Sequence, residues 1–153
     1  MRNVVIYCLG LSMLLACVSQ RKSASGQGIV GEVRWLEGNL MPTIGDTTYA
    51  ARAKGIPVKR EIHIYKAVKT EDTKVEDGTF FTKVNSAMVK KIKTDREGRF
   101  RISLPSGRYS VFVLEEDRLF ANIFNGDNLI NPVTVEPGNY TEIQISINYQ
   151  AYY

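Results

Sequence analysis

Cysteine is almost absent from this sequence. The 153-residue chain has only two cysteines, Cys8 and Cys17, and both lie close to its N-terminus. A domain formed by the remaining residues has no thiol for a disulfide bond, a cysteine-ligated metal or a cysteine nucleophile. Its stability must therefore come from a hydrophobic core, which a chain of this length is able to form.

Histidine is nearly as rare, because His63 is the only one. One imidazole cannot form a metal site that needs two histidines, and no Gly-x-Ser-x-Gly nucleophile elbow accompanies it. We therefore expect His63 to be an exposed or edge residue. The sequence predicts no catalytic residue, no metal and no cofactor, so the protein is not expected to be an enzyme.

Excess charge of one sign is also small. Lys and Arg number 20 against 16 Asp and Glu, which gives a formal net charge of +4. A nucleic-acid-binding domain normally has a much stronger basic excess, so we expect no nucleic-acid partner. The apolar fraction of 44% and the charged fraction of 24% are those of an ordinary folded domain.

One apolar run, residues 4–16, follows Arg2 and Asn3 and carries no charge. It is too short for a transmembrane helix, which needs about 20 residues, but it has the length of a signal-peptide core. The run ends Leu14-Leu15-Ala16-Cys17, which resembles the lipobox of bacterial lipoproteins. We predict that residues 1–16 are a signal peptide and that Cys17 carries acyl chains such as palmitate, which anchor the protein in a membrane.

Downstream of Cys17 the chain divides into two parts. Residues 17–28 are small and polar, so they are predicted to form a flexible tether. Residues 29–153 show a hydrophobic period of two in short stretches, separated by Gly, Pro, Asn and Asp. This pattern predicts an all-β domain, a Greek-key-type β-sandwich of about seven antiparallel strands. The strands are expected at 29–36, 58–67, 87–94, 99–104, 109–114, 132–136 and 140–149, with long connections at 37–57 and 68–86.

The strand at 109–114 differs from the others because both of its faces are largely apolar. Tyr109, Val111 and Val113 share one face, whereas Phe112 and Leu114 share the other. A strand of this kind is expected at the centre of a sheet, covered on both sides.

The C-terminal half also carries a recognisable motif. The run Thr94-Asp95-x-x-Gly98-x-Phe100-x-Ile102-x-Leu104-Pro105-x-Gly107-x-Tyr109-x-Val111 resembles the carboxypeptidase regulatory-like, transthyretin-like β-sandwich domains. Together with the lipobox, it is similar to small lipoproteins of Bacteroidota. The resemblance implies a prealbumin-like fold, no catalysis, and a role as an accessory, spacer or adhesion module. It also implies that Tyr109 is buried and that its hydroxyl bonds a nearby backbone group.

Two stretches, 35–42 and 119–126, combine aromatic, Met and amide side chains outside the regular alternation. Such residues either close the end of a sandwich or form a binding patch, and we give capping the greater weight. The candidate patch consists of Trp35, Asn39, Met41, Phe120, Asn122, Phe124 and Asn125. Its ligands would be envelope proteins or glycans.

Two charged groups complete the candidate residues. Glu115, Glu116 and Asp117 are expected to form a solvated acidic turn, with a calcium site that includes Asp127 as the less favoured alternative. Five basic residues on two strands are expected to form a solubilising face, or less often a site for acidic polysaccharide or lipid headgroups. They are Lys90, Lys91, Lys93, Arg99 and Arg101.

These observations together predict a non-enzymatic, membrane-anchored lipoprotein that acts as an accessory or interaction module of the bacterial cell envelope. A carbohydrate-binding lipoprotein is the alternative, and a hydrolase is a distant third. Val18 follows the cysteine and the tether is basic, so we expect an outer-membrane lipoprotein that faces the periplasm. The membrane is the one partner that the sequence itself implies, and the oligomeric state stays open.

The anchor is tested by Cys17→Ala. We expect the variant to lack acyl chains and to leave the membrane fraction when cells are fractionated, because a chain without its lipid has no other predicted anchor. Mass spectrometry of the wild-type N-terminus supplies the control. Retention of the variant in the membrane fraction would refute lipidation as the anchor.

Overall fold

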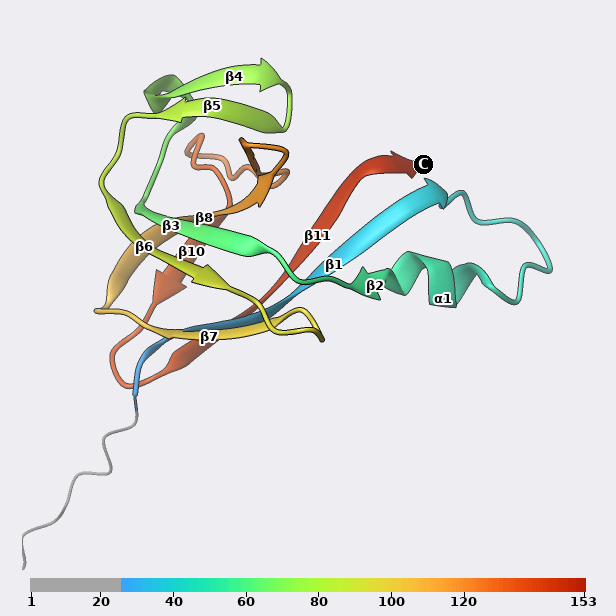
Figure 1. The fold of residues 1–153 in the computed structure, drawn as a ribbon, viewed down its shortest axis with the longest axis horizontal. Helices are drawn as coiled ribbons and strands as arrows, with labels where there is room; N and C mark the ends of the chain where they lie inside the picture. Colours follow the sequence, from blue (N-terminus) through green and yellow to red (C-terminus); the bar gives the residue numbers. More distant parts are fainter. Residues whose placement is uncertain (1–25) are drawn as a thin grey trace, which may run out of the picture.

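The computed structural model describes residues 26–153 of the chain (Figure 1). The predicted signal peptide, Cys17 and most of the tether lie outside these residues. The predicted all-β sandwich is confirmed, because the described residues form two sheets of four and seven strands. The first residues of the fold lie inside the predicted tether, since strand β1 begins at Gly28 and the Gln27 amide donates to the carbonyl of Leu104.

The four-stranded sheet joins both ends of the described chain. Its strands are β1 (Gly28–Asn39), β2 (Ile56–Pro57), β7 (Arg99–Ser103) and β11 (Tyr140–Tyr152). β11 pairs with β1 in parallel, with Gly28 opposite Tyr140, and β7 pairs antiparallel on the other side of β1. One parallel pair therefore occurs where only antiparallel pairing was expected.

The seven-stranded sheet packs against the first. It is ordered β4-β5-β9-β8-β3-β6, and β10 pairs with β8 beside β9. These strands are β3 (Glu61–Lys66), β4 (Thr73–Asp77), β5 (Phe80–Val84), β6 (Met88–Lys93), β8 (Gly107–Glu115), β9 (Arg118–Phe120) and β10 (Pro132–Val135). The described residues thus form eleven strands rather than about seven.

The long connections predicted at 37–57 and 68–86 are not structureless. The first contains the helix α1 (Tyr49–Lys54) and the short strand β2, and the second contains the 3-10 turn η1 (Thr70–Asp72) and the hairpin of β4 and β5. These strands were missed because β4 is exposed and polar and β2 has two residues, so neither shows a buried alternating face. No helix among residues 26–153 is long and apolar enough to cross a membrane.

β8 is covered on both faces, as the sequence predicts. Val111 and Val113 lie in the main core between the two sheets, together with Ile62 and Ile64 of β3. Phe112 points to the opposite face of β8 and lies in a second cluster together with Phe81 of the β4–β5 hairpin. The second cluster consists of Tyr65, Val68, Phe81, Phe112, Ala121 and Ile130.

The turns of the recognised motif have the expected geometry. Gly98 has a φ of +72°, and a Cβ there would lie 2.4 Å from the carbonyl oxygen of Val33, so glycine is required on both counts. The Tyr109 ring is fully buried, and its hydroxyl donates to the carbonyl of Pro105 at 2.8 Å. The implied role of Tyr109 as a buried ring with a bonded hydroxyl is therefore confirmed.

The second cluster should contribute measurably to stability. Phe112 packs edge-on against Tyr65 and Phe81, with ring centroids 5.6 Å apart in both pairs. We expect Phe112→Ala to lower the free energy of unfolding by about 3–5 kcal/mol, measured by urea denaturation. Phe124→Ala is the matched control, because that ring is 44% exposed, and its loss should be below about 1 kcal/mol. Equal losses would show that the hairpin does not close a second core.

Candidate functional site

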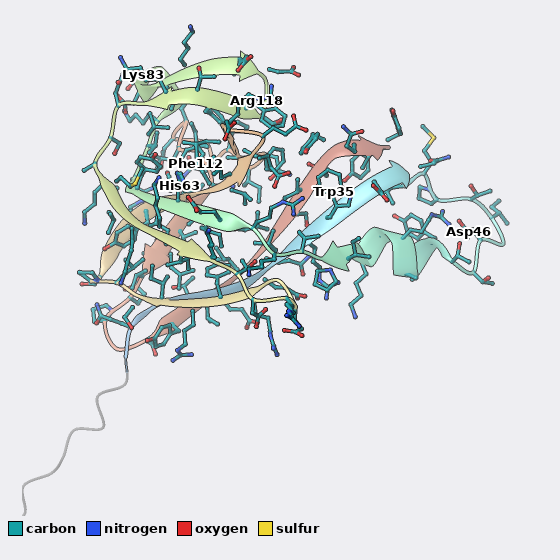
Figure 2. The ribbon with its side chains drawn as sticks, viewed as in Figure 1. Trp35, Asp46, His63, Lys83, Phe112 and Arg118 are labelled. Atoms are coloured by element: carbon teal, nitrogen blue, oxygen red, sulfur yellow. The ribbon has the colours of Figure 1, made fainter. Side chains whose placement is uncertain are left out.

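The structure divides the seven candidate patch residues among three places. Trp35, which is labelled in Figure 2, and Asn39 lie in the half of β1 that is farther from Gly28, and Met41 lies just beyond the end of the strand. Phe120 of β9 is fully buried in the main core, so no ligand contacts it in this structure. The rings therefore do not form a single array.

The other three candidates lie in the segment between β9 and β10. The Asn122 amide donates to the carbonyl of Ser146 at 2.9 Å and to the side chain of Asn148 at 2.7 Å, which ties this segment to β11. The Asn125 side chain accepts the backbone N–H of Leu129 at 2.9 Å and so shapes a turn. Phe124 is 44% exposed and leans on Phe81 of the second cluster.

Exposed apolar residues gather at the far end of β1 and β11, which we call the distal tip: residues 35–57 together with Tyr152 and Tyr153. Five of the nine large apolar residues that are exposed in the described chain belong to it. They are Met41, Ile44, Ile56, Tyr152 and Tyr153, with exposed fractions of 51%, 105%, 59%, 69% and 67%. Tyr153 was not expected from the sequence, because a C-terminal residue beyond the last alternation carries no periodic signal.

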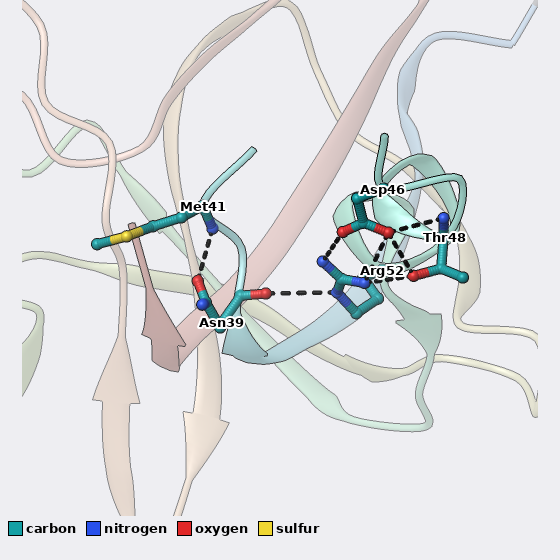
Figure 3. Close-up of polar contacts among 5 residues, drawn as sticks. All are labelled: Asn39, Met41, Asp46, Thr48 and Arg52. Atoms are coloured by element: carbon teal, nitrogen blue, oxygen red, sulfur yellow. Dashed lines mark hydrogen bonds and ion pairs between the residues drawn. The ribbon is translucent and has the colours of Figure 1, made fainter. Parts of the chain in front are cut away.

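A polar network holds the loop of the distal tip in one conformation (Figure 3). The Arg52 guanidinium on α1 donates to the Asp46 carboxylate at 2.6 Å and, through its Nε, to the carbonyl of Asn39 at 3.4 Å. Asp46 also accepts the backbone N–H and the hydroxyl of Thr48. The hydrogen bond from Arg52, and then those from Thr48, lower the pKa of Asp46 far below its ordinary value of 3.8. Hydrogen bonds from Arg52 and from Thr48 thus hold the loop that contains Met41 and Ile44.

Trp35 connects the distal tip to the core. Its ring stands edge-on to Tyr149 with centroids 5.1 Å apart, and its Nε1–H donates to the Glu37 carboxylate at 2.8 Å. The ring borders a hollow of about 240 Å³ that is also lined by Glu37, Ala51, Arg52, Gly55 and Ile56. An apolar ring with a carboxylate and a guanidinium beside it is suited to contacts that are partly apolar and partly polar.

Trp35 belongs to an aromatic cluster that also contains Phe80, Phe120 and Tyr149. Neighbouring centroids lie between 5.0 and 5.7 Å apart, and Arg118 covers the outer face of Phe80 at 4.0 Å. Phe80 and Tyr149 were not among the candidates, because each lies in a strand whose partner strands the sequence does not reveal.

Glu115 anchors the same cluster and is not part of a solvated turn. It is 4% exposed, forms an ion pair with Arg60, and accepts the hydroxyl of Tyr149 at 3.1 Å. Burial, and then the hydrogen bond to Glu115, raise the pKa of Tyr149 to about 12. The expectation of a solvated acidic turn is confirmed for Glu116 and Asp117, which are exposed in a turn, and is wrong for Glu115, because its arginine partner comes from a segment 55 residues away along the chain. Among residues 26–153, no three His, Cys, Asp or Glu side chains form a group able to hold a metal ion.

His63 is buried rather than exposed or at an edge. It is 5% exposed and lies on β3 between β6 and β8, where its Nε2 contacts the Glu61 carboxylate at 2.8 Å (Figure 2). Its Nδ1 has no hydrogen-bond partner among the described residues. The hydrogen bond from His63 is the largest cause of a lowered pKa at Glu61. The alternation of β3 suggested a polar face, but the second cluster covers that face.

The five basic residues are all exposed on two edge strands. Lys90, Lys91 and Lys93 lie on β6, and Arg99 and Arg101 lie on β7. Lys91 and Lys93 approach the Glu61 carboxylate only at 4.0 and 3.9 Å, and Arg101 stacks on Tyr140 at 3.5 Å. Pairs this exposed contribute little to stability, so these side chains are available to solvent.

Comparison with protein-family models, with curated proteins and with solved structures found no match to this chain. The arguments about function therefore start from the site itself. Its distinguishing property is a hydrogen-bonded loop with apolar side chains exposed to solvent, and exposed apolar residues that lie together are typical of surfaces that bind another macromolecule.

The polar network of the distal tip is tested by Arg52→Ala. We expect faster hydrogen exchange at the Thr48 amide and its neighbours, because Asp46 loses the partner that positions it, while the midpoint of global unfolding changes little. Lys54→Ala on the same helix is the control. Asp46 must be ionised to form its ion pair with Arg52. The wild type should therefore keep this ion pair above about pH 4 and lose it as the pH falls through the lowered pKa of Asp46. Identical exchange in wild type and Arg52→Ala at pH 6 would contradict this role.

Proposed function

We propose that the protein is a non-enzymatic lipoprotein of the bacterial cell envelope, anchored through Cys17, and that it acts as an accessory module that docks a partner protein with its distal tip. The observation that carries the proposal is that the distal tip contains five exposed large apolar residues, and the tip lies at the end of β1 opposite to Gly28 (Figure 1). The resemblance to carboxypeptidase regulatory-like domains stays a prediction that agrees with this role.

The geometry of the chain supports the proposed orientation. Gly28 follows Cys17 by eleven residues, a length that reaches at most about 40 Å when extended. β1 then runs for twelve residues, about 40 Å, toward the tip. An anchor at one end and an apolar surface at the other would place that surface well clear of the lipid headgroups, where a second protein has access.

The chemistry of the tip supports a protein partner. Met41 and the two C-terminal tyrosines belong to residue types that are enriched at protein interfaces, and the side chains around them are mixed in charge. Because Arg52 and Asp46 hold the loop in place before binding, little conformational entropy would be lost when the partner arrives. These properties favour a specific contact over a merely exposed loop.

The proposal is tested by in-cell cross-linking of the full-length protein, comparing Ile44→Ser with Val75→Ser. Val75 is also an exposed aliphatic residue, at 45%, but it lies on the β4–β5 hairpin. We expect both variants to reach the membrane, Val75→Ser to cross-link the same envelope protein as wild type, and Ile44→Ser to bind it about tenfold more weakly. Equal cross-linking by both variants would exclude the tip as the docking surface.

Carbohydrate binding is the second candidate, and the hollow beside Trp35 is the observation that favours it. Trp35 is the only tryptophan of the chain, so its fluorescence reports directly on this hollow. Envelope glycans that bind there should change the emission of wild type and of Phe124→Ala alike, but not that of Arg52→Ala. Unchanged emission with all glycans tested would remove this candidate and leave the protein partner.

A further inference from the structure

The edge strands on the two sides of the sandwich differ in their content of basic residues. On one side, the edge strands β6 and β7 carry the five exposed basic residues Lys90, Lys91, Lys93, Arg99 and Arg101. On the other side, β11 is the edge of the four-stranded sheet, and β4 and β10 are edge strands of the seven-stranded sheet. β4 contains Lys74, but neither β10 nor β11 contains a lysine or an arginine. Charged side chains on an edge strand, lysine above all, prevent it from pairing with another chain. The β10 and β11 side lacks this protection.

β11 has unpaired backbone groups along that side. It pairs with β1 only, and no other strand of residues 26–153 lies against its second edge. The carbonyl of Ser146 points away from β1, because it accepts the amide of Asn122. Backbone groups alternate in direction along a strand, so those of Glu142 and Gln144 point the same way. The stretch before Ser146 is therefore free to pair.

An apolar hollow of about 260 Å³ lies beside this stretch, between β11 and β10. Its ends are marked by two side-chain bridges, from Thr141 to the carbonyl of Thr134 and from Asn122 to that of Ser146. Half-buried Ile143 and the 56%-exposed Ile123 border it, and core residues of both sheets form its floor. Its full lining is Val111, Ile123, Asn131, Pro132, Val133, Ile143, Gln144 and Ile145.

We propose that a second copy of this chain pairs with β11 in antiparallel fashion about a two-fold axis through Ile143. In this register Glu142 lies opposite Gln144 of the other copy, and their backbone groups form the hydrogen bonds that the open edge lacks. Ile143 faces its own symmetry mate on the inner side of the sheet, and each Ile143 fills the hollow of the other copy. The two four-stranded sheets become one continuous sheet across the axis.

The charge pattern favours a second copy over an unrelated strand. Glu142 is the only charged residue of β11, and this register sets it against an amide rather than against another carboxylate. The same short stretch thus supplies both partners without a like-charge contact, as a two-fold interface requires. This proposal is independent of the distal tip.

Disulfide trapping of the full-length protein in membranes tests the contact. Residues that face each other across the axis come close enough for a disulfide, and Ile143→Cys places a thiol there. We expect a band at twice the monomer mass on non-reducing gels. Ile92→Cys is the matched control, because Ile92 is also half-buried and packed against the core, but on the lysine-protected edge β6. Wild type controls for cross-linking through Cys17. A yield for Ile143→Cys no higher than for Ile92→Cys would overturn the proposal.

A charge swap tests the register without a change in the core. Gln144→Glu opposes two pairs of carboxylates in the dimer, so we expect about fivefold weaker association at low salt, measured by sedimentation of the detergent-solubilised protein. Glu142→Lys added to Gln144→Glu replaces both repulsions by attractions and should restore association. Both positions are exposed, so the fold should be unaffected. A monomeric wild type, or association that does not respond to either variant, would refute the pairing.

Discussion

The pairing of β1 with β11 is the interaction on which the rest of the structure depends. It joins the first and last strands of the described chain over nearly their whole lengths and places Val33 opposite Ile145, and both strands contribute to the main core. Bringing such distant segments together costs loop-closure entropy, which the buried aliphatic face must offset. The same pair runs past β7 and so carries the distal tip beyond the sandwich.

The aromatic cluster connects the core to the tip through packed rings. Trp35 belongs to the tip and to the cluster at once, and Tyr149 holds it from β11 while bonding the buried Glu115. A carboxylate that is 4% exposed is stable only with partners, and Arg60 and Tyr149 supply them. The proposed docking loop is therefore seated on a packed base, and this favours affinity through preorganisation.

Alternation and turn chemistry predicted much of this fold from the sequence. The two apolar faces of β8 predicted its position at the centre of a sheet. The motif predicted the turn from Asp95 to Gly98 and the buried Tyr109. β4 was missed because an exposed strand has no hydrophobic period, and β5 was missed because its two buried residues, Phe80 and Phe81, are adjacent and do not alternate. His63 and Glu115 were misjudged for a related reason: their burial depends on segments that reach them only in the folded chain. Of the candidate patch, Trp35, Asn39 and Met41 came together at the tip, whereas Phe120 was taken into the core.

The sequence by itself determined that the described domain is a β-sandwich stabilised by a hydrophobic core without a cysteine, and it predicted the lipid anchor at Cys17. The composition and the hydrophobic period of two are enough for the β-sandwich prediction, because both can be read from residues that are close together in the sequence. Only the tertiary structure decided that β1 and β11 run parallel, that the apolar tip lies at the far end of β1 from Gly28, and that β11 keeps an open edge. These features depend on which distant segments meet, and pairing between distant strands leaves no signature in either strand alone.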